Sequence, residues 1–71
     1  MNRQCKLIVE YMRTYKEITS LEAFANLGVS RLSARIWDLR HEHGLKIGAH
    51  PRKVRNINGG FTTVTAYYLE D

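Results

Sequence analysis

The basic side chains of this sequence are numerous and clustered enough to form a binding surface. The 71 residues include 11 Lys and Arg and 7 Asp and Glu, which gives a formal net charge of +4 at neutral pH. The segment 31–55 carries a net charge of +5, whereas residues 1–30 carry +1 and residues 56–71 carry −2. Such a cluster is typical of a surface that binds a polyanion. The alternative is a solvated surface that is basic without a ligand.

Metal-binding and catalytic patterns are the other chemistry to consider. On a helix, His41 and His43 point about 200° apart and cannot hold one ion from the same face. Cys5 is the single cysteine, so the sequence has no Cys-x-x-Cys zinc pattern and no intrachain disulfide. The few acidic residues are spread along the chain, and no glycine-rich phosphate loop follows a strand. We therefore expect no enzyme, no cofactor, no metal ion and no small-molecule substrate.

The length and hydropathy of the chain limit its class. A chain of 71 residues is expected to form a single domain, residues 1–71, with a small core. The apolar run at 7–9 is too short for a signal peptide, and no stretch approaches the roughly 20 apolar residues of a membrane span. The sequence is therefore expected to be a cytoplasmic protein that makes no contact with a membrane.

Two helices are expected before the basic segment, and they would help to position it. In helix 3–15, which Asn2 would cap, the apolar residues recur at helical spacing: Cys5, Ile8, Met12 and Tyr15. In helix 20–27, Thr19 and Glu22 fit a capping box and Gly28 ends the helix. The apolar stripe of this second helix consists of Leu21, Phe24 and Leu27.

A third helix is expected over 31–43. Ser30 is the expected N-cap, Gly44 ends the helix, and the inward stripe consists of Leu32, Ile36, Leu39 and His43. Two helices joined by a short turn that contains glycine predict a helix-turn-helix.

After residue 44 the apolar period changes from helical to alternating. Leu45, Ile47 and Ala49 predict a half-buried strand, and Pro51 predicts an edge position because it cannot donate to a strand ladder. The run 54–57, the turn Asn58-Gly59-Gly60 and the β-branched run 61–69 complete a hairpin over about 45–69. Ile18 could add a short strand. Three helices followed by a β-hairpin wing predict an α+β winged helix-turn-helix.

Two sequence runs resemble those of a known family. The run Ile18-Thr19-Ser20-Leu21-Glu22-Ala23-Phe24, the run from Leu27 to Arg40 and the ending Ala66-Tyr67-Tyr68-Leu69 are similar to small winged helix-turn-helix proteins of bacteriophages and prophages. The resemblance covers about residues 5 to 69, and it implies a DNA-binding fold with a regulatory role. Tyr15 and Trp37 depart from the family pattern, where smaller residues are expected.

The third helix provides the expected recognition face. Its residues opposite the apolar stripe are Ser30, Arg31, Ala34, Trp37, Asp38 and His41, with Ser33 and Arg40 on one flank and Arg35 on the other. Recognition helices place their first residues against base edges in the major groove. Small side chains allow a close approach, and Arg31 could contact guanine with both ends of its guanidinium. Arg35 could also pair with Asp38 on the helix surface.

The hairpin provides the expected wing contacts. Its basic residues are Arg52, Lys53 and Arg55, and Asn58 and Gly59 form the tip. A basic hairpin can follow the phosphate backbone or enter the minor groove, where arginine is favoured. Charged residues and proline also protect an edge strand from aggregation, and both roles are compatible.

The sequence thus predicts sequence-specific binding of double-stranded DNA by a phage or prophage transcriptional regulator. Three roles are open for Trp37: packing on the wing, stacking on nucleic acid, or contact with a partner or a second copy in a homodimer. Two other functions are also open. One is a protein-interaction module that binds a host or phage protein, and the other is an accessory factor for replication or excision.

Overall fold

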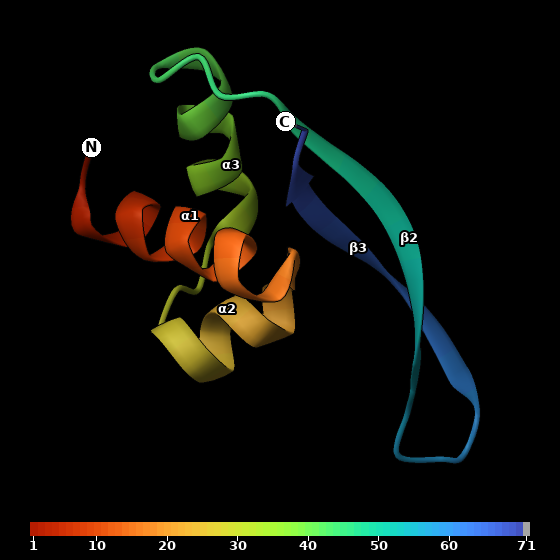
Figure 1. Cartoon of the computed structure of the whole chain (residues 1–71). Coiled ribbons are helices and arrows are strands. Elements are labelled where there is room, and N and C mark those ends of the chain that lie inside the picture. Colours follow the sequence, from red (N-terminus) through yellow and green to blue (C-terminus); the bar gives the residue numbers. More distant parts are fainter. Residues whose placement is uncertain (71) are drawn as a thin grey trace.

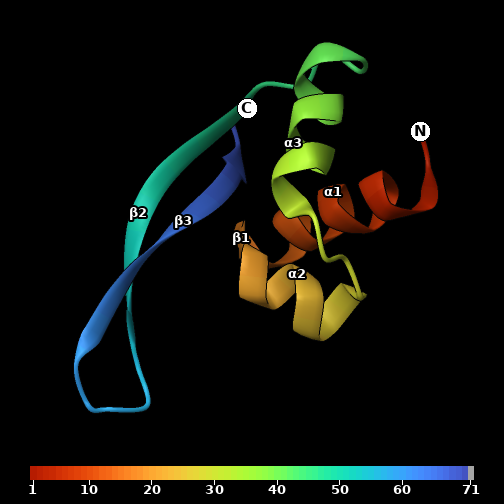
Figure 2. The same cartoon turned by 180° about the vertical axis from the view of Figure 1, so that it is seen from behind.

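A computed structural model describes residues 1–70 of the chain. The elements follow in the order α1 (Arg3–Tyr15), β1 (Glu17–Thr19), α2 (Ser20–Leu27), α3 (Leu32–His41), β2 (Ile47–Arg55) and β3 (Phe61–Leu69). This is the α+β arrangement predicted, in which the helices precede a long hairpin. Figures 1 and 2 show that the hairpin starts beside the C-terminal end of α3 and runs past α2, beyond which its tip projects.

The first two helices begin as their sequences predict. The side chain of Asn2 accepts a hydrogen bond of 2.8 Å from the backbone N–H of Cys5, which caps α1. At α2, Thr19 accepts from the backbone N–H of Glu22, and the Glu22 carboxylate accepts from the backbone N–H of Thr19. Gly28 then ends α2 in the left-handed conformation, at φ 70°. Both N-caps and the capping box are confirmed.

The predicted apolar stripe of α2 faces the core only at Leu27. Leu21 and Phe24 are 72% and 62% exposed, whereas Ala23 is fully buried and Leu27 is partly buried against the core. The small side chain of Ala23 lets α2 pack closely, and this turns the two large side chains outward. Two large apolar residues therefore remain on the surface of α2.

The boundaries of α3 differ from the predicted ones. The helix spans Leu32–His41 rather than 31–43, and its N-cap is Arg31, not Ser30; no side-chain hydrogen bond caps this end. At the other end, the backbone N–H of Leu45 turns back to the carbonyl of Leu39 at 3.0 Å, which closes the helix early. His43 is consequently exposed and lies outside the inward stripe.

The three strands form one antiparallel sheet in the order β1-β3-β2. Ile18 pairs with Tyr67, so the short first strand proposed from the sequence is present. β2 is one continuous strand on the edge of the sheet and Pro51 lies within it, as an edge position allows. The sequence predicts that the apolar residues of this strand face the core in alternation. Ile47 is buried as predicted, but Ala49 is exposed.

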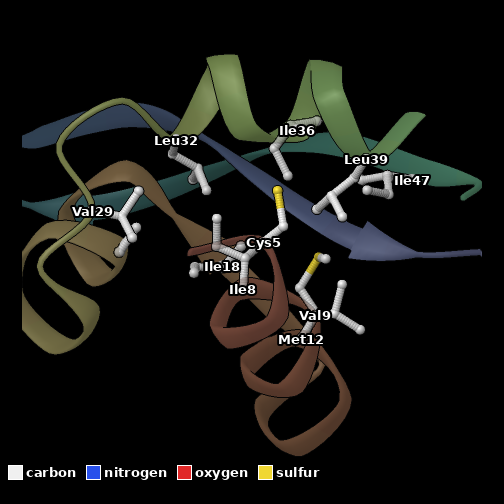
Figure 3. Packing of buried hydrophobic residues seen from close by; sticks show 11 residues of the cluster. Cys5, Ile8, Val9, Met12, Ile18, Val29, Leu32, Ile36, Leu39 and Ile47 are labelled. Atoms are coloured by element: carbon white, nitrogen blue, oxygen red, sulfur yellow. The ribbon is translucent and has the colours of Figure 1, made fainter. Parts of the chain in front are cut away.

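The core lies between α1, α3 and the sheet. Figure 3 shows the α3 residues Leu32, Ile36 and Leu39 directed toward the α1 residues Cys5 and Ile8. All five side chains are at most 2% exposed. The predicted inward phase of α3 is therefore confirmed at these three positions, and the opposite face of the helix is left for other contacts. Tyr15, which was expected in the stripe of the first helix, is exposed.

Candidate nucleic-acid interface

The face of α3 opposite the core is exposed and carries small side chains. Ser30, Arg31, Ser33 and His41 are exposed, and Ala34 is half-buried. Because the burial of Leu32, Ile36 and Leu39 fixes the rotation of the helix, these residues lie on the side away from α1. Serine and alanine side chains do not prevent the helix backbone from approaching a groove.

The N-terminal end of α3 offers unsatisfied hydrogen-bond donors. The first N–H groups of a helix have no partner within the helix, and this end has no side-chain cap, unlike α1 and α2. Within residues 1–70 the guanidinium of Arg31 makes no hydrogen bond or ion pair. The backbone donors at the start of the helix suit a phosphate group, and the guanidinium of Arg31 is left without a partner.

Trp37 stands out on the same face. Its indole is 56% exposed, and it stacks on the imidazole of His41, one turn along, with the ring centroids 4.5 Å apart. This contact lies within α3 and covers only part of the indole. The remaining exposed surface is available to nucleic acid or to a partner.

Two arginines on the flanks of α3 are held by other parts of the domain. Nε of Arg35 lies 3.1 Å from Oδ2 of Asp38, without the alignment of a hydrogen bond, and Nη1 donates to Gln4 of α1. Arg40 donates two hydrogen bonds to the carbonyl of Ile47, at 3.1 and 2.7 Å, and its guanidinium carbon lies 5.9 Å from the ring centroid of Tyr67. Both side chains connect α3 to neighbouring elements.

Arg52 connects the base of the wing to the rest of the fold. Its guanidinium lies 2.7 Å from a carboxylate oxygen of Glu17 and 3.1 Å from one of Glu22. The other oxygen of Glu17 bonds to the imidazole of His50. Hydrogen bonds from Arg52 and His50 lower the pKa of Glu17, and the hydrogen bond to Glu17 raises the pKa of His50. This cluster joins β2 to β1 and to the start of α2.

The outer part of the hairpin carries cations that have no such partners. Among the described residues, the side chains of Lys53 and Arg55 form no hydrogen bond or ion pair, although Arg55 lies over the ring of Phe61. Asn58 and Gly59 are exposed at the tip. The predicted DNA-contact residues thus separate into a group whose side chains make no hydrogen bond or ion pair among the described residues and a group that is held by internal contacts, the latter consisting of Arg35, Asp38, Arg40 and Arg52.

Sequence reasoning did not single out two residues of the tip, Asn56 and Ile57. Asn56 forms several hydrogen bonds inside the turn, and Ile57 is almost fully exposed. An isoleucine directly before Asn-Gly-Gly was a readable signal, because an apolar residue in a polar turn has no core to join.

Among residues 1–70, no three His, Cys, Asp or Glu side chains gather where a metal ion could bind.

Burial, followed by the charge of Asp38, raises the pKa of the Cys5 thiol. Within residues 1–70, no helix has the length and apolar character needed to cross a membrane.

Two helices joined at a glycine turn, with a third helix behind them and a hairpin beside them, define a winged helix. The profile of the winged helix-turn-helix domain family matches residues 3–71, and the chain belongs to this family. Winged helix-turn-helix domains are typically DNA-binding modules rather than enzymes. No curated protein and no solved structure gives a significant match to the chain.

Proposed function

We propose that this protein binds double-stranded DNA in a sequence-specific manner, with α3 in the major groove and the wing on the phosphate backbone or in the minor groove. The observation that carries the proposal is the uncapped start of α3, where the unpaired Arg31 lies beside exposed small side chains. A helix that is bordered by bulky or internally paired side chains at this end would not fit the groove.

The proposed contacts are the residues of the predicted DNA face whose side chains are not held by internal hydrogen bonds or ion pairs. On α3 they are Ser30, Arg31, Ser33, Ala34, Trp37 and His41; on the wing they are Lys53, Arg55, Asn58 and Gly59. Arg31 reads a guanine edge, and the two wing cations hold the backbone. The internally held residues of α3 and of the wing base (Arg35, Asp38, Arg40 and Arg52) keep these contacts at a fixed spacing.

The biological setting is part of the proposal. The runs 18–24 and 27–40 resemble those of phage and prophage winged helix proteins, which supports a role as a transcriptional regulator of that kind. A single module buries a modest area on DNA, so tight binding favours two copies on one site.

One observation favours a second candidate function. Leu21 and Phe24 lie exposed on α2, outside the proposed DNA face. They suit contact with another protein, which would be a partner in regulation, replication or excision.

The test is selection of bound duplexes from a random pool, followed by fluorescence anisotropy on a selected duplex and on a scrambled one. Arg31→Ala should cost about 1–3 kcal/mol on the selected duplex and relax its sequence preference. The melting temperature should not change, because the Arg31 side chain caps nothing. Lys53→Ala is the matched control, and it should weaken both duplexes alike. If the selection enriches no sequence, specific binding is refuted; if the two variants behave alike, Arg31 contacts only the backbone.

A further inference from the structure

Ile57 lies at the tip of the wing with its side chain 99% exposed. On β3 the buried residue nearest the tip is Ala66, which pairs with His50 of β2. No residue of β2 between His50 and the tip is buried. The side chain therefore contributes nothing to the core. In water, an exposed isoleucine carries an unfavourable hydration free energy that a polar residue would avoid.

The turn holds Ile57 in a defined position. Oδ1 of Asn56 accepts hydrogen bonds from the backbone N–H groups of Asn58 and Gly60, at 3.0 and 3.1 Å. Its Nδ2 donates to Thr62 across the hairpin at 3.3 Å. The backbone adds two bonds, from Asn56 N–H to the Gly60 carbonyl and from Gly59 N–H to the Asn56 carbonyl. Bonds on both sides of Ile57 fix the loop while its side chain points out of it.

The surroundings of Ile57 are cationic. The hairpin contains no Asp or Glu from Ile47 to Leu69. Arg55 and Lys53 lie on the strand that leads to the tip, and Arg55 pairs with Phe61, which is 66% exposed, directly across the hairpin. An apolar residue at the tip of a cationic arm fits a polyanion that has an apolar interior, and the stacked bases of a DNA duplex are such an interior.

From this geometry we propose that Ile57 inserts between two base pairs from the minor groove and bends the duplex, while Lys53 and Arg55 bind the phosphates on either side. The proposal rests on the proposed function, since it needs the wing to reach DNA. The minor groove is about 6 Å wide, so it is the outward-pointing side chain of Ile57, not the whole hairpin, that enters it. Proteins that insert isoleucine or leucine in this way kink the duplex by about 20–90° toward the major groove.

DNA is favoured over other macromolecules by the size of the apolar tip. A stable protein interface buries upwards of about 1,000 Å² around a cluster of anchors, and a membrane-surface segment needs a broad apolar face. A single held side chain provides neither. It does provide what is needed to separate one base step, above all a pyrimidine–purine step, which unstacks readily.

The experiment measures binding and bending separately on one duplex. A 24-bp duplex, selected by the wild-type protein from a random pool, carries a donor and an acceptor dye at its ends. A second copy carries 2-aminopurine in place of adenine at its pyrimidine–purine steps, and anisotropy reports binding. A kink of about 60° at the centre brings the ends about 10 Å closer. We expect wild-type protein to raise energy transfer and 2-aminopurine fluorescence together.

Two variants test whether Ile57 is responsible. Ile57→Ala should still bind, about three- to tenfold more weakly, but should leave energy transfer and 2-aminopurine fluorescence at the values of free DNA. Ile57→Leu keeps an apolar wedge and should restore both signals. Since the side chain is almost fully exposed, both variants should melt at the wild-type temperature, which excludes misfolding as the cause.

The outcomes separate this proposal from the one on which it rests. If wild type binds but neither bends nor unstacks the duplex, or if Ile57→Ala bends it as wild type does, the wedge is refuted while DNA binding stands. If wild type binds no duplex, both proposals fail. Wild-type protein that ignores DNA but sediments with phosphatidylserine vesicles through Ile57 would instead identify the tip as a lipid contact.

Discussion

The neighbouring wing residues Arg52 and Lys53 provide a matched test of which cations contact DNA. They are adjacent in the sequence and each loses one positive charge on substitution by alanine. Arg52 is held by Glu17 and Glu22, whereas Lys53 is exposed and has no ion-pair partner among residues 1–70. Arg52→Ala should therefore lower stability, and Lys53→Ala should lower DNA affinity.

The magnitudes follow from the distribution of the cations. Four basic residues of the segment 31–55 are free of internal ion pairs and hydrogen bonds in the described chain, namely Arg31, Lys46, Lys53 and Arg55. At about −0.9 per neutralised phosphate, the two wing cations proposed to hold the backbone, Lys53 and Arg55, contribute about −1.8 to the slope of log K against log salt, and Lys53→Ala should make the slope less negative by about 0.9. Arg52→Ala should keep the wild-type slope.

The stability cost of Arg52→Ala is set by two ion pairs whose side chains are 24–32% exposed. Partly exposed pairs contribute up to about 1 kcal/mol each, so the loss from the two pairs should be at most about 2 kcal/mol. For a domain of this size each kcal/mol lowers the melting temperature by about 4–8 °C. Lys53→Ala should melt like wild type.

Anisotropy titrations on one duplex at four salt concentrations measure the slopes, and thermal unfolding followed by circular dichroism measures the stabilities. If Arg52→Ala reduces the slope as much as Lys53→Ala and leaves the melting temperature unchanged, the inward contacts of Arg52 do not form in solution. The division of the wing into anchoring and DNA-contacting cations would then be refuted.

Three further predictions concern the core and the ion-pair cluster. Ile36→Ala should cost about 2–5 kcal/mol through lost burial and a cavity, whereas Ala34→Lys should leave the melting temperature nearly unchanged and alter DNA affinity; the reverse result in thermal melts would mean that the recognition face is misassigned. The hydrogen bond to Glu17 raises the pKa of His50 in the folded state. The stability that this contact contributes is therefore fully present below the ordinary pKa of about 6.5 and is lost as pH rises through the raised value. Wild type should therefore lose more stability between about pH 5.5 and pH 8.5 than His50→Gln does, and equal losses would contradict the Glu17 contact. Cys5, which is buried with a raised pKa, should react with a thiol reagent only at the rate of unfolding, and rapid labelling of folded protein would show that α1 packs differently.

Regular local patterns were readable from the sequence because their causes are local. The spacing of Leu32, Ile36 and Leu39 fixes the inward face of α3, and the capping box at the start of α2 needs only residues three positions apart. The start of α3 was not readable in this way. Ser30 has a suitable side chain, but Val29 is buried and the backbone of Arg31 (φ −127°, ψ 65°) is not yet helical, so the N-cap lies one residue later, at Arg31.

The internally held cations could not be recognised because their partners are distant in the sequence. Arg52 meets Glu17, which is 35 positions away, only because β1 and β2 both pair with β3. Arg40 is held by a carbonyl in the first residue of β2. Similarly, the outward position of Leu21 and Phe24 depends on the close packing of Ala23, which an eight-residue helix does not reveal by its apolar spacing.

An NMR titration of isotopically labelled protein with a duplex selected from the random pool tests DNA binding by α3 and the wing most directly. We expect the largest amide shifts over 30–34, at the start of α3, and over 53–59, in the outer wing. The amide signals of residues on the exposed side of α1 should not shift. Shifts confined to α1 or to the surface of α2 around Leu21 and Phe24, or no shifts at all, would contradict the account.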